Sequence, residues 1–312
     1  MPLVSVVIPV RDDPAGVRAV TAALERQTLP RDRFEVIVAV DGGEPPAVPP
    51  GVRVEAGPPR NSYAARNRAA RTARGDVLAF TDADCLPAPD WLERGLAALD
   101  GADIVAGAVR FTVEGRLTPW ALLDVEQNLD QEAAVRRNVA VTANLFMRRA
   151  TFDAIGGFDD TLPSGSDHDA VSRAVRAGAA LRYAERAAIS HPARTRARAL
   201  LANRWFTLFH GAARWGRDGG AGTPGGKLLL LPLVGAIAER RLEGRPLSRL
   251  DARRLAFSGI SATRRQQVAA LLAGALVVSP VTSAARLAGT VHGVRMRRAT
   301  LDEPPPRCDA CA

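Results

Sequence analysis

The first hundred residues alternate between continuous apolar runs and stretches with helical spacing. The apolar runs predict buried strands of a parallel sheet at Leu3–Val10, Phe34–Val40 and Val77–Thr81, and a further short strand is expected at Val52–Glu55. The stretches between them predict helices at Pro14–Thr28 and Asn61–Ala73. Because strands and helices alternate, we expect a parallel α/β sheet whose ligands bind at the carboxyl ends of the strands.

The pattern becomes less regular after residue 90. Apolar spacing predicts helices at Trp91–Leu99 and Asp169–Ala177, the second ended by Gly178, and an irregular helical region at Trp120–Asn138. A strand is predicted at Asp103–Phe111 and another within Leu181–Ser190, and Leu145–Arg148 is a short apolar segment.

The last third of the chain has a different character. Residues 194–217 predict a helix with one apolar face made by Leu201, Trp205, Leu208, Ala212 and Trp215. The Gly/Pro-rich stretch Asp218–Gly226 predicts a linker, and the tail 299–312 is expected to be disordered. Of two further apolar segments, Leu228–Ala238 is too short to span a bilayer. Val268–Ala285 nearly reaches the required length but contains Pro280, so helices lying on a membrane or packed on the rest of the protein are favoured.

Charge divides the chain into two parts. The 312 residues carry 42 Lys+Arg and 33 Asp+Glu, a net charge of +9. Residues 1–180 hold 20 basic and 25 acidic side chains, whereas residues 181–312 hold 22 and 8. The acidic part can hold a cation, and the basic part can meet an anionic surface such as a membrane. Lys227 is the sole lysine, so the arginine excess is consistent with coding bias and we expect no nucleic-acid partner.

The cysteines and the first residues bear on localisation. Three cysteines, Cys85, Cys308 and Cys311, are too few for a disulfide framework and favour a reducing compartment. The start MPLVSVVIPVRDD lacks the basic and apolar regions of a secretory signal. We therefore expect a cytoplasmic protein, either free or peripheral at the inner face of the cell membrane, and an oligomer is compatible with the sequence.

Three aspartates end predicted strands. Asp41 closes the second strand, and Asp82 and Asp84 follow the strand VLAFT as the motif D-x-D. In an extended segment, residues two apart point the same way, so Asp82 and Asp84 can share one pocket. Two carboxylates in one pocket repel each other unless a cation lies between them, and Mg²⁺ or Mn²⁺ prefers such oxygen ligands. A solvated acidic turn is the alternative interpretation of this motif alone.

Six motifs in unbroken order make residues 3–215 resemble the family 2 glycosyltransferases of the GT-A fold. They are VSVVIPVRDD, FEVIVAVDGG, NSYAARNRAARTARGDVLAFTDAD, TANLFMRRATFDAIGGFDD, SGSDHDAVSRAVRAG and AAISH. The resemblance implies a mostly parallel, mixed sheet flanked by helices, with a C-terminal helical extension. It implies a glycosyltransferase domain at 1–217, with a nucleotide-sugar half at 1–100 and an acceptor half at 101–217. The basic helical extension then covers 218–298.

The resemblance also implies which residues bind the donor. Pro9, Val10 and Arg11 match the nucleotide loop, and Asn61 begins the motif helix. Asp41 would lie at the base, where a carboxylate accepts from an N–H and suits uracil better than adenine, so a UDP-type donor is favoured. Asp82 would lie near the ribose and sugar, and Asp84 would bind Mg²⁺ or Mn²⁺ bridging the diphosphate. Arg66 either positions the nucleotide or is a solvated charge.

The acceptor side follows from the same resemblance. Asp167 matches the family's acidic general base, although Ser166 stands where the family usually has a glutamate. Asp169, two residues on, is the competing candidate and otherwise an acceptor-side residue, as is Asn144. His191 is either a loop-end histidine or a ligand of the metal or diphosphate.

The sequence therefore predicts an inverting, metal-dependent glycosyltransferase that moves a sugar from a nucleotide-sugar donor to an acceptor hydroxyl. The acceptor stays open among lipid-linked, glycan and small-molecule classes. A nucleotidyltransferase is disfavoured by the Gly-Gly-Phe-Asp turn. A non-catalytic nucleotide-sugar-binding or scaffolding protein stays open, because Val40 and Ser166 depart from the family pattern.

Overall fold

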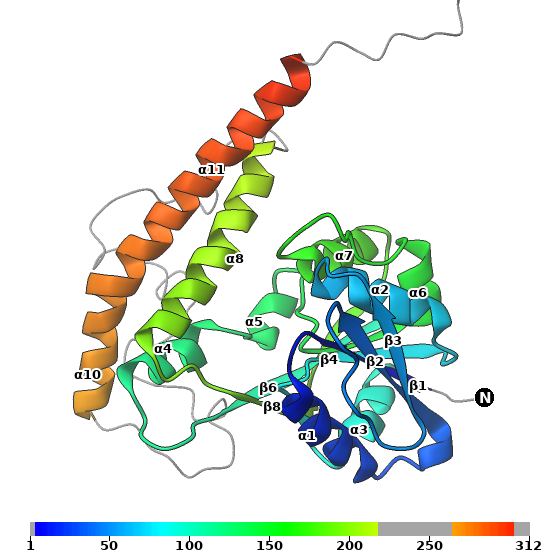
Figure 1. Ribbon diagram of the computed structural model, residues 1–312. Helices are drawn as coiled ribbons and strands as arrows, with labels where there is room; N and C mark the ends of the chain where they lie inside the picture. The colour runs from blue at the N-terminus through cyan, green and yellow to red at the C-terminus, as the bar shows by residue number, and fades with distance from the viewer. Residues whose placement is uncertain (1–3, 218–263, 303–312) are drawn as a thin grey trace, which may run out of the picture. The chain divides into compact units, whose positions relative to one another are not determined.

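The computed structural model describes residues 4–217 and 264–302, and these residues form two compact units (Figure 1). The first, here called the α/β unit, comprises residues 4–117 and 121–193. The second, the helical unit, comprises residues 118–120, 194–217 and 264–302. The predicted linker Asp218–Gly226, the apolar segment Leu228–Ala238 and residues 303–312 of the predicted tail lie outside the described residues.

An eight-stranded sheet forms the centre of the α/β unit, in the order β3-β2-β1-β4-β7-β6-β8-β5. Its strands are β1 (Val4–Val10), β2 (Phe34–Asp41), β3 (Val52–Gly57), β4 (Val77–Thr81), β5 (Leu86–Pro87), β6 (Ile104–Thr112), β7 (Asn144–Arg148) and β8 (Leu181–Pro192). The first four strands are parallel, as the apolar runs predict.

The sheet is mixed because β7 enters it in the opposite direction. β7 is antiparallel to β4 and to β6, and β8 is parallel to β6. Consequently β1, β2, β4, β6 and β8 all point the same way, and their carboxyl ends meet at one edge of the sheet. In parallel sheets this edge is where ligands bind.

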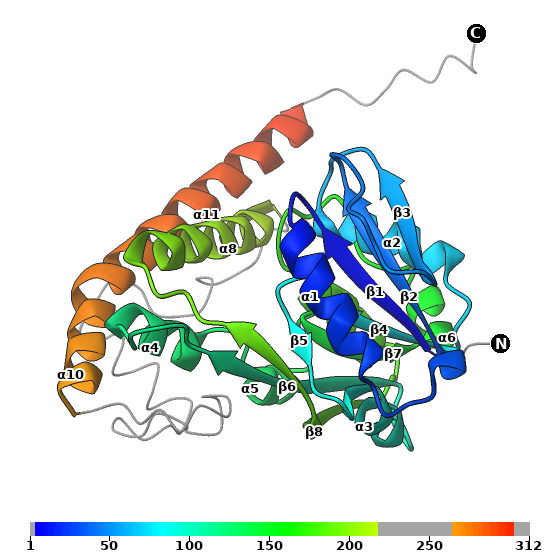
Figure 2. The ribbon, with the colours of Figure 1, turned by 60° about the horizontal axis from the view of Figure 1, so that its bottom comes forward.

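Helices cover both faces of the sheet (Figures 1 and 2). One apolar cluster joins α1 and α3 to side chains of β1 such as Val6 and Ile8, and the other joins α2, α6 and α7 to Val7 and Ile37. The helices of the unit are α1 (Pro14–Glu25), α2 (Ser62–Thr72), α3 (Trp91–Ala98), α4 (Pro119–Gln127, whose first residues belong to the helical unit), α5 (Gln131–Val135), α6 (Arg149–Ala154) and α7 (Ser166–Arg176), with a 3₁₀ turn at Arg31–Arg33.

Several predicted boundaries are wrong. The first helix ends at Glu25 and not at Thr28, and the irregular region 120–138 is two helices separated at Leu129, which has a φ of 49°. Two errors move functional residues. The helix expected from Asp169 begins at Ser166, and the strand expected to end at Ser190 continues to Pro192. Asp167 therefore lies in a helical first turn, and His191 lies in a strand and not at a loop end.

The helical unit contains α8 (Ala197–Arg217), α10 (Arg264–Ala273), a π-helical turn (Gly274–Val278) and α11 (Ser279–Asp302). α8 and α11 run side by side in both views of the ribbon. Gly289 makes this approach possible, because a Cβ there would meet the backbone carbonyl of Phe209. The expectation of disorder from residue 299 is wrong for 299–302, which continue α11. No described helix is long and apolar enough to cross a bilayer.

Candidate active site

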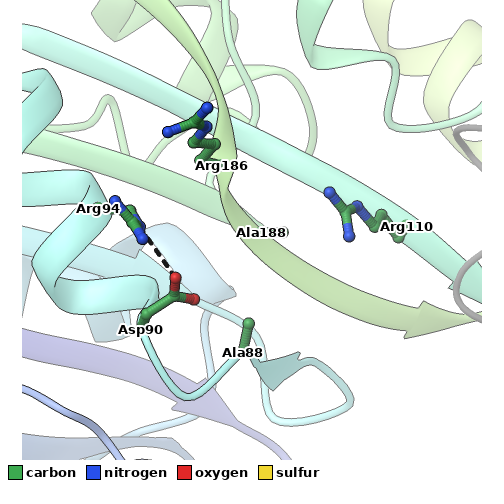
Figure 3. Close-up of a pocket in the computed structure, with 6 residues that line it drawn as sticks. All are labelled: Ala88, Asp90, Arg94, Arg110, Arg186 and Ala188. Carbon is green, nitrogen blue, oxygen red and sulfur yellow. Dashed lines mark hydrogen bonds and ion pairs between the residues drawn. The ribbon is translucent and has the colours of Figure 1, made fainter.

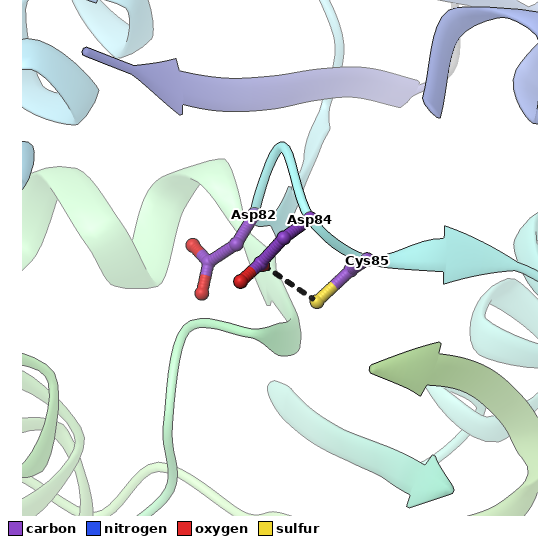
Figure 4. A group of neighbouring side chains, drawn as sticks. All are labelled: Asp82, Asp84 and Cys85. Carbon is purple, nitrogen blue, oxygen red and sulfur yellow. Dashed lines mark hydrogen bonds between the residues drawn. The ribbon is translucent and has the colours of Figure 1, made fainter. Parts of the chain in front are cut away.

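The two aspartates of the D-x-D motif lie just beyond β4, at the carboxyl edge of the sheet (Figure 4). Oxygens of Asp82 and Asp84 and the Cys85 sulfur lie within 4.8 Å of one another. Gly16 lets the first turn of α1 come close to this loop, because a Cβ there would lie 2.8 Å from the Ala83 carbonyl oxygen. The motif is thus a fixed turn between packed elements and not a freely solvated one.

Arg66 is buried and forms an ion pair with Asp82, since its Nη2 contacts Asp82 Oδ1. Of its two interpretations, the solvated charge is therefore wrong. Burial is the largest cause that raises the pKa of the Asp82 carboxyl, and the charges of Asp84 and Asp167 raise it further. The charge of Arg66 and, less strongly, that of His191 act to lower the same pKa. The charges of four other side chains therefore act on Asp82 at this edge, and a cation would favour the ionised form of its carboxylate.

His191 approaches the motif from β8. Its Nε2 lies 3.5 Å from Asp84 Oδ2, and its ring meets Phe111 of β6 edge-on at 5.5 Å between centroids. Its Nδ1 is buried without a hydrogen-bond partner. Asp84, with a half-exposed side chain, presents carboxylate oxygens, which suit Mn²⁺ or Mg²⁺, and the buried His191 presents an imidazole nitrogen beside them.

Cys85 contributes little to such a donor set. Its Sγ lies 3.7 Å from Asp84 Oδ1, but the side chain is buried. Burial, with the charges of Asp82 and Asp84 next, raises the pKa of the thiol well above its ordinary value. Because a thiol binds metal as the thiolate, Cys85 is a weaker ligand here than the two carboxylates.

Asp167 is held in the first turn of α7 by several donors. Its Oδ1 accepts from the Tyr63 hydroxyl at 3.2 Å and from the His168 N–H at 2.9 Å. Its Oδ2 accepts from the Thr142 N–H at 3.2 Å. These contacts fix both oxygens of a carboxylate whose charge is felt at Asp82.

Asp169 has a different role. Its Oδ2 accepts from Arg173 Nε at 2.7 Å, one helical turn on, and the other nitrogens of Arg173 donate to the carbonyls of Ile155 and Gly157. Asp169 therefore belongs to a bridge between α7 and the Gly-Gly-Phe-Asp turn. This pairing favours Asp167 as the carboxylate available for chemistry.

Asn144 does not lie where an acceptor could reach it. The side chain is fully buried, its Oδ1 accepts from Trp91 Nε1 at 2.8 Å, and its Nδ2 donates to the carbonyls of Ala108 and Ala187 at 2.9 and 2.8 Å. Gly107 leaves the space that this side chain fills. Asn144 thus ties β7 to β6, β8 and α3, and the expected acceptor-side position is corrected to a structural one.

The predicted nucleotide residues lie at the ends of β1 and β2. Pro9 and Val10 are the buried last residues of β1, and Arg11 is exposed just after them. Asp41 is buried at the end of β2, where its Oδ1 accepts from the Arg60 N–H at 2.7 Å and its Oδ2 lies 3.9 Å from Arg11 Nη1. These residues meet at the same sheet edge as the D-x-D motif.

Asn61 caps α2. Its Oδ1 accepts from the Ala64 N–H at 2.9 Å, and its Nδ2 donates to the Asp160 carbonyl at 2.8 Å. Arg60 also pairs with the Asp160 carboxylate at 3.3 Å, and Asn67 makes two hydrogen bonds to the backbone of Phe158. Asn61 therefore joins the start of α2 to the segment after the Gly-Gly-Phe-Asp turn.

A separate hollow of about 250 Å³ lies elsewhere in the α/β unit (Figure 3). It is lined by Ala88, Asp90, Arg94, Arg110, Arg186 and Ala188, and Asp90 pairs with Arg94 at 2.9 Å. None of the predicted site residues lines it.

Sequence reasoning missed Tyr63 and Thr142, the two side chains that contact Asp167 from other elements. One signal for Tyr63 was present. Tyr63 and Arg66 are three apart in the predicted helix, so they share a face. No comparable signal marks Thr142, because its contact depends on how β7 and α7 come together.

Comparisons with known proteins identify the family. The sequence model of glycosyl transferase family 2 matches residues 5–156. Glycosyltransferase AglE of Haloferax volcanii is 35% identical over 208 residues, which cover 62% of this chain and 68% of that protein. The pre-mycofactocin glycosyltransferase of Mycobacterium tuberculosis is 31% identical over 220 residues, 65% of this chain, and the chain spans 45% of that relative's length.

Solved structures resemble the fold. The mannosyltransferase PcManGT from Pyrobaculum calidifontis, in complex with GDP-Man and Mn²⁺, superposes with a TM-score of 0.52 at 17% identity. The superposition covers 96% of this chain and 78% of that one. The α/β architecture is therefore the GT-A type that the sequence motifs imply.

Proposed function

The chain belongs to glycosyltransferase family 2, and we propose that it is an inverting, metal-dependent member that moves a sugar from a nucleotide-sugar donor to an acceptor hydroxyl. One observation carries the proposal: Asp82, Asp84 and His191 lie together at a single sheet edge, where the charge of Asp167 also acts on Asp82. Such a cluster fits a reaction that needs both a neutralised leaving group and a base.

The donor diphosphate is assigned to Asp84 and His191 through Mg²⁺ or Mn²⁺. Both side chains fit such an ion, because Asp84 is accessible and His191 places its Nε2 3.5 Å from Asp84 Oδ2. When bound, such an ion neutralises the charge that develops on the leaving diphosphate. Arg66 holds Asp82 beside this position, where the Asp82 carboxylate accepts hydrogen bonds from donor hydroxyls. The related fold of PcManGT, solved with GDP-Man and Mn²⁺, supports this assignment.

Asp167 is assigned as the general base. It takes the proton of the acceptor hydroxyl while that oxygen forms a bond to the anomeric carbon, and the bond from that carbon to the diphosphate breaks. Because attack and departure occur on opposite faces of the carbon, one displacement inverts the configuration. The donors on both Asp167 oxygens orient the carboxylate for this step.

A uridine donor is favoured by Asp41. A carboxylate has about four lone-pair sites, so the Arg60 N–H on Oδ1 leaves capacity to accept the N3–H of uracil. Guanine presents an N1–H as well, and the neighbour PcManGT was solved with GDP-Man, so guanosine donors form the natural comparison.

The acceptor is proposed to be presented at an anionic membrane surface. In 194–217 and 264–302 the sequence has twelve arginines and one acidic residue, Asp302. The same segments expose large apolar side chains, including Trp205, Leu276 and Leu287. Basic residues near an anionic membrane contribute about 1 kcal/mol each, and inserted apolar area adds to this.

A donor screen tests the activity. Purified full-length protein is incubated with UDP-, GDP- and dTDP-sugars and Mn²⁺, Mg²⁺ or EDTA, and nucleoside diphosphate release is measured. We expect metal-dependent release from UDP-sugars, and an inverted anomeric configuration in any glycoside product by NMR. Absence of release from every donor contradicts the activity, and release from GDP-sugars alone contradicts the uridine assignment. Release of nucleoside diphosphate in the presence of EDTA contradicts the proposed metal dependence.

A further inference from the structure

One aromatic side chain of α2 contacts Asp167 directly and contacts Arg66, the partner of Asp82. The Tyr63 hydroxyl donates to Asp167 Oδ1 at 3.2 Å and accepts the Gly165 N–H at 3.2 Å. The face of the same ring lies 5.6 Å from the guanidinium carbon of Arg66. Arg66 in turn forms the ion pair with Asp82. Tyr63 thus stands between the carboxylate proposed to act on the acceptor and the carboxylate proposed to contact the donor.

Tyr63 also determines how α7 begins. Gly165, whose φ of 79° is left-handed, is the last residue before α7, and its N–H points to the Tyr63 oxygen. Asp167 follows in the first turn. A single hydroxyl therefore fixes both the entry of the chain into the helix and one oxygen of the carboxylate, while the Thr142 N–H fixes the other oxygen.

The hydroxyl has a use that a phenylalanine ring would not supply. The ring already packs on Phe158 at 5.8 Å between centroids, so the apolar contact does not need an oxygen. A buried hydroxyl costs free energy unless it is hydrogen-bonded, and here it both donates and accepts. Burial, with the Asp167 charge next, raises the pKa of Tyr63 above its ordinary value, so the hydroxyl keeps its proton.

We propose that Tyr63 is a positioning residue that orients Asp167 for proton transfer and couples it to the Arg66–Asp82 pair. This inference rests on the proposed function. In this role Tyr63 touches neither donor nor acceptor. It acts through Asp167 on the acceptor and through the Arg66–Asp82 pair on the donor. The hydroxyl acts on the acceptor side, through Asp167, and the ring acts on the donor side, through Arg66.

The two parts of the side chain can be separated by substitution. Tyr63→Phe keeps the ring under Arg66 and removes the hydroxyl, so the transfer rate kcat should fall roughly tenfold with donor KM within about twofold. The acidic limb of the pH–rate profile should move to higher pH, because a carboxylate that loses a donor is less stable as the anion. Tyr63→Leu also removes the ring and should raise donor KM in addition.

A matched control separates positioning from loss of stability. Phe152 belongs to the same apolar cluster and packs on Phe80 and Phe158, but it has no hydrogen bond to Asp167. Phe152→Leu should lower the melting temperature and leave the shape of the pH–rate profile unchanged. If Phe152→Leu moves the acidic limb as Tyr63→Phe does, or if Tyr63→Phe leaves kcat and the limb unchanged, Tyr63 is a core residue only and the inference is overturned.

A second measurement needs no activity. Tyr63→Phe, Asp167→Ala and the double variant form a double-mutant cycle in the free energy of unfolding, obtained from denaturant titrations. We expect the sum of the two single losses in stability to exceed the loss in the double variant, since both substitutions remove the same hydrogen bond. Additive losses would mean that the contact does not exist in solution and would overturn the inference. Coupling in a protein that transfers from no donor would instead show the contact intact and the proposed function wrong.

Discussion

The α/β unit and the helical unit treat their large apolar side chains differently. Nine such side chains are exposed among those that the structure describes, and Leu86 is the only one of the nine in the α/β unit. The other eight lie on the helices of the second unit and are Trp205, Phe206, Leu272, Leu276, Val277, Leu287, Val291 and Met296. Exposed apolar surface of this extent typically marks a site of interaction with a partner or a membrane.

Polar side chains show the reverse distribution. Every buried polar or charged side chain in the described part of the chain, from Ser5 to His191, lies in the α/β unit. Burying such groups costs free energy unless each finds a partner, so their gathering marks where structure is held for chemistry. Under the proposed function, reaction and attachment are divided between the two units, and substitutions can test that division.

The largest expected effect is at the proposed base. Asp167→Asn should keep donor binding and lose transfer by roughly 10²- to 10⁴-fold, the range for a general base, as measured by product formation at saturating donor. Asp169→Asn is the matched control on the same helix. It removes the charge opposite Arg173 and should retain most activity. A dead Asp169 variant beside an active Asp167 variant would mean that the base is wrongly assigned.

The next effect concerns the metal. Asp84→Asn should lower activity by roughly 10²- to 10³-fold, the scale of losing one preorganised charge, with an unchanged melting temperature because the side chain is half exposed. A higher Mn²⁺ concentration should recover part of the rate. If the variant stays fully active, or if wild-type activity persists in EDTA, the site does not use a metal at Asp84.

Strands such as β1, β2 and β4 were predictable, because a short, continuous apolar run in a chain of this length has few alternatives to forming a buried strand. The positions of Asp41, Asp82 and Asp84 were predictable because each ends or follows an apolar strand, whereas Asp167 was identified from the family resemblance and lies in a helix. What escaped prediction depends on tertiary contact: Tyr63 and Asp167 are separated by 104 positions and meet only after α2 and α7 pack on one face of the sheet.

Asn144 shows a different limit. A motif tells which residues are near one another along the chain, but the direction of a side chain depends on the strand's neighbours. Here β7 joins β4 and β6, so Asn144 lies between carbonyls of β6 and β8 and not at the surface. The helix starts near Asp167 were missed for a similar reason, because Gly165 and Ser166 carry no strong helix signal.

Stability should follow the same division between units. Asn144→Ala leaves the Trp91 N–H and two backbone carbonyls without their partner, so the free energy of unfolding should fall by about 2–4 kcal/mol in denaturant titrations. Leu276→Ser is the counterpart in the helical unit, where the side chain is 70% exposed, and should change stability by less than about 0.5 kcal/mol. Equal losses would mean that Leu276 is covered in solution and that the comparison between the units fails.

Membrane attachment should depend on the helical unit. Full-length protein should sediment with anionic vesicles at low salt, and Leu276→Asp with Leu287→Asp should weaken this roughly tenfold, because two inserted leucines are lost. Leu86→Asp, at the one exposed large apolar residue described in the α/β unit, should have no effect on vesicle binding. Sedimentation that is insensitive to the double substitution would assign this apolar surface to a protein contact. Equal sedimentation with zwitterionic vesicles would mean that the basic residues do not contribute to attachment.

The smallest expected effect lies at the edge of the sheet opposite the site, where Glu35 is held by Ser5, the Arg74 N–H and Arg53 at 2.7, 2.5 and 2.9 Å. Burial acts to raise the pKa of Glu35, but these hydrogen bonds and the Arg53 charge outweigh it and hold the pKa below its ordinary value. A depressed pKa in the folded state adds stability above the unfolded pKa of about 4.3, and that stability is lost as the pH falls through the folded value. Glu35→Gln should therefore cost about 1–2 kcal/mol at pH 7, measured by denaturant titration, and the difference from wild type should shrink towards pH 3. A difference that stays constant from pH 7 to pH 3 would mean that the charge of Glu35 does not stabilise the α/β unit, and that its buried polar groups outside the site serve packing alone.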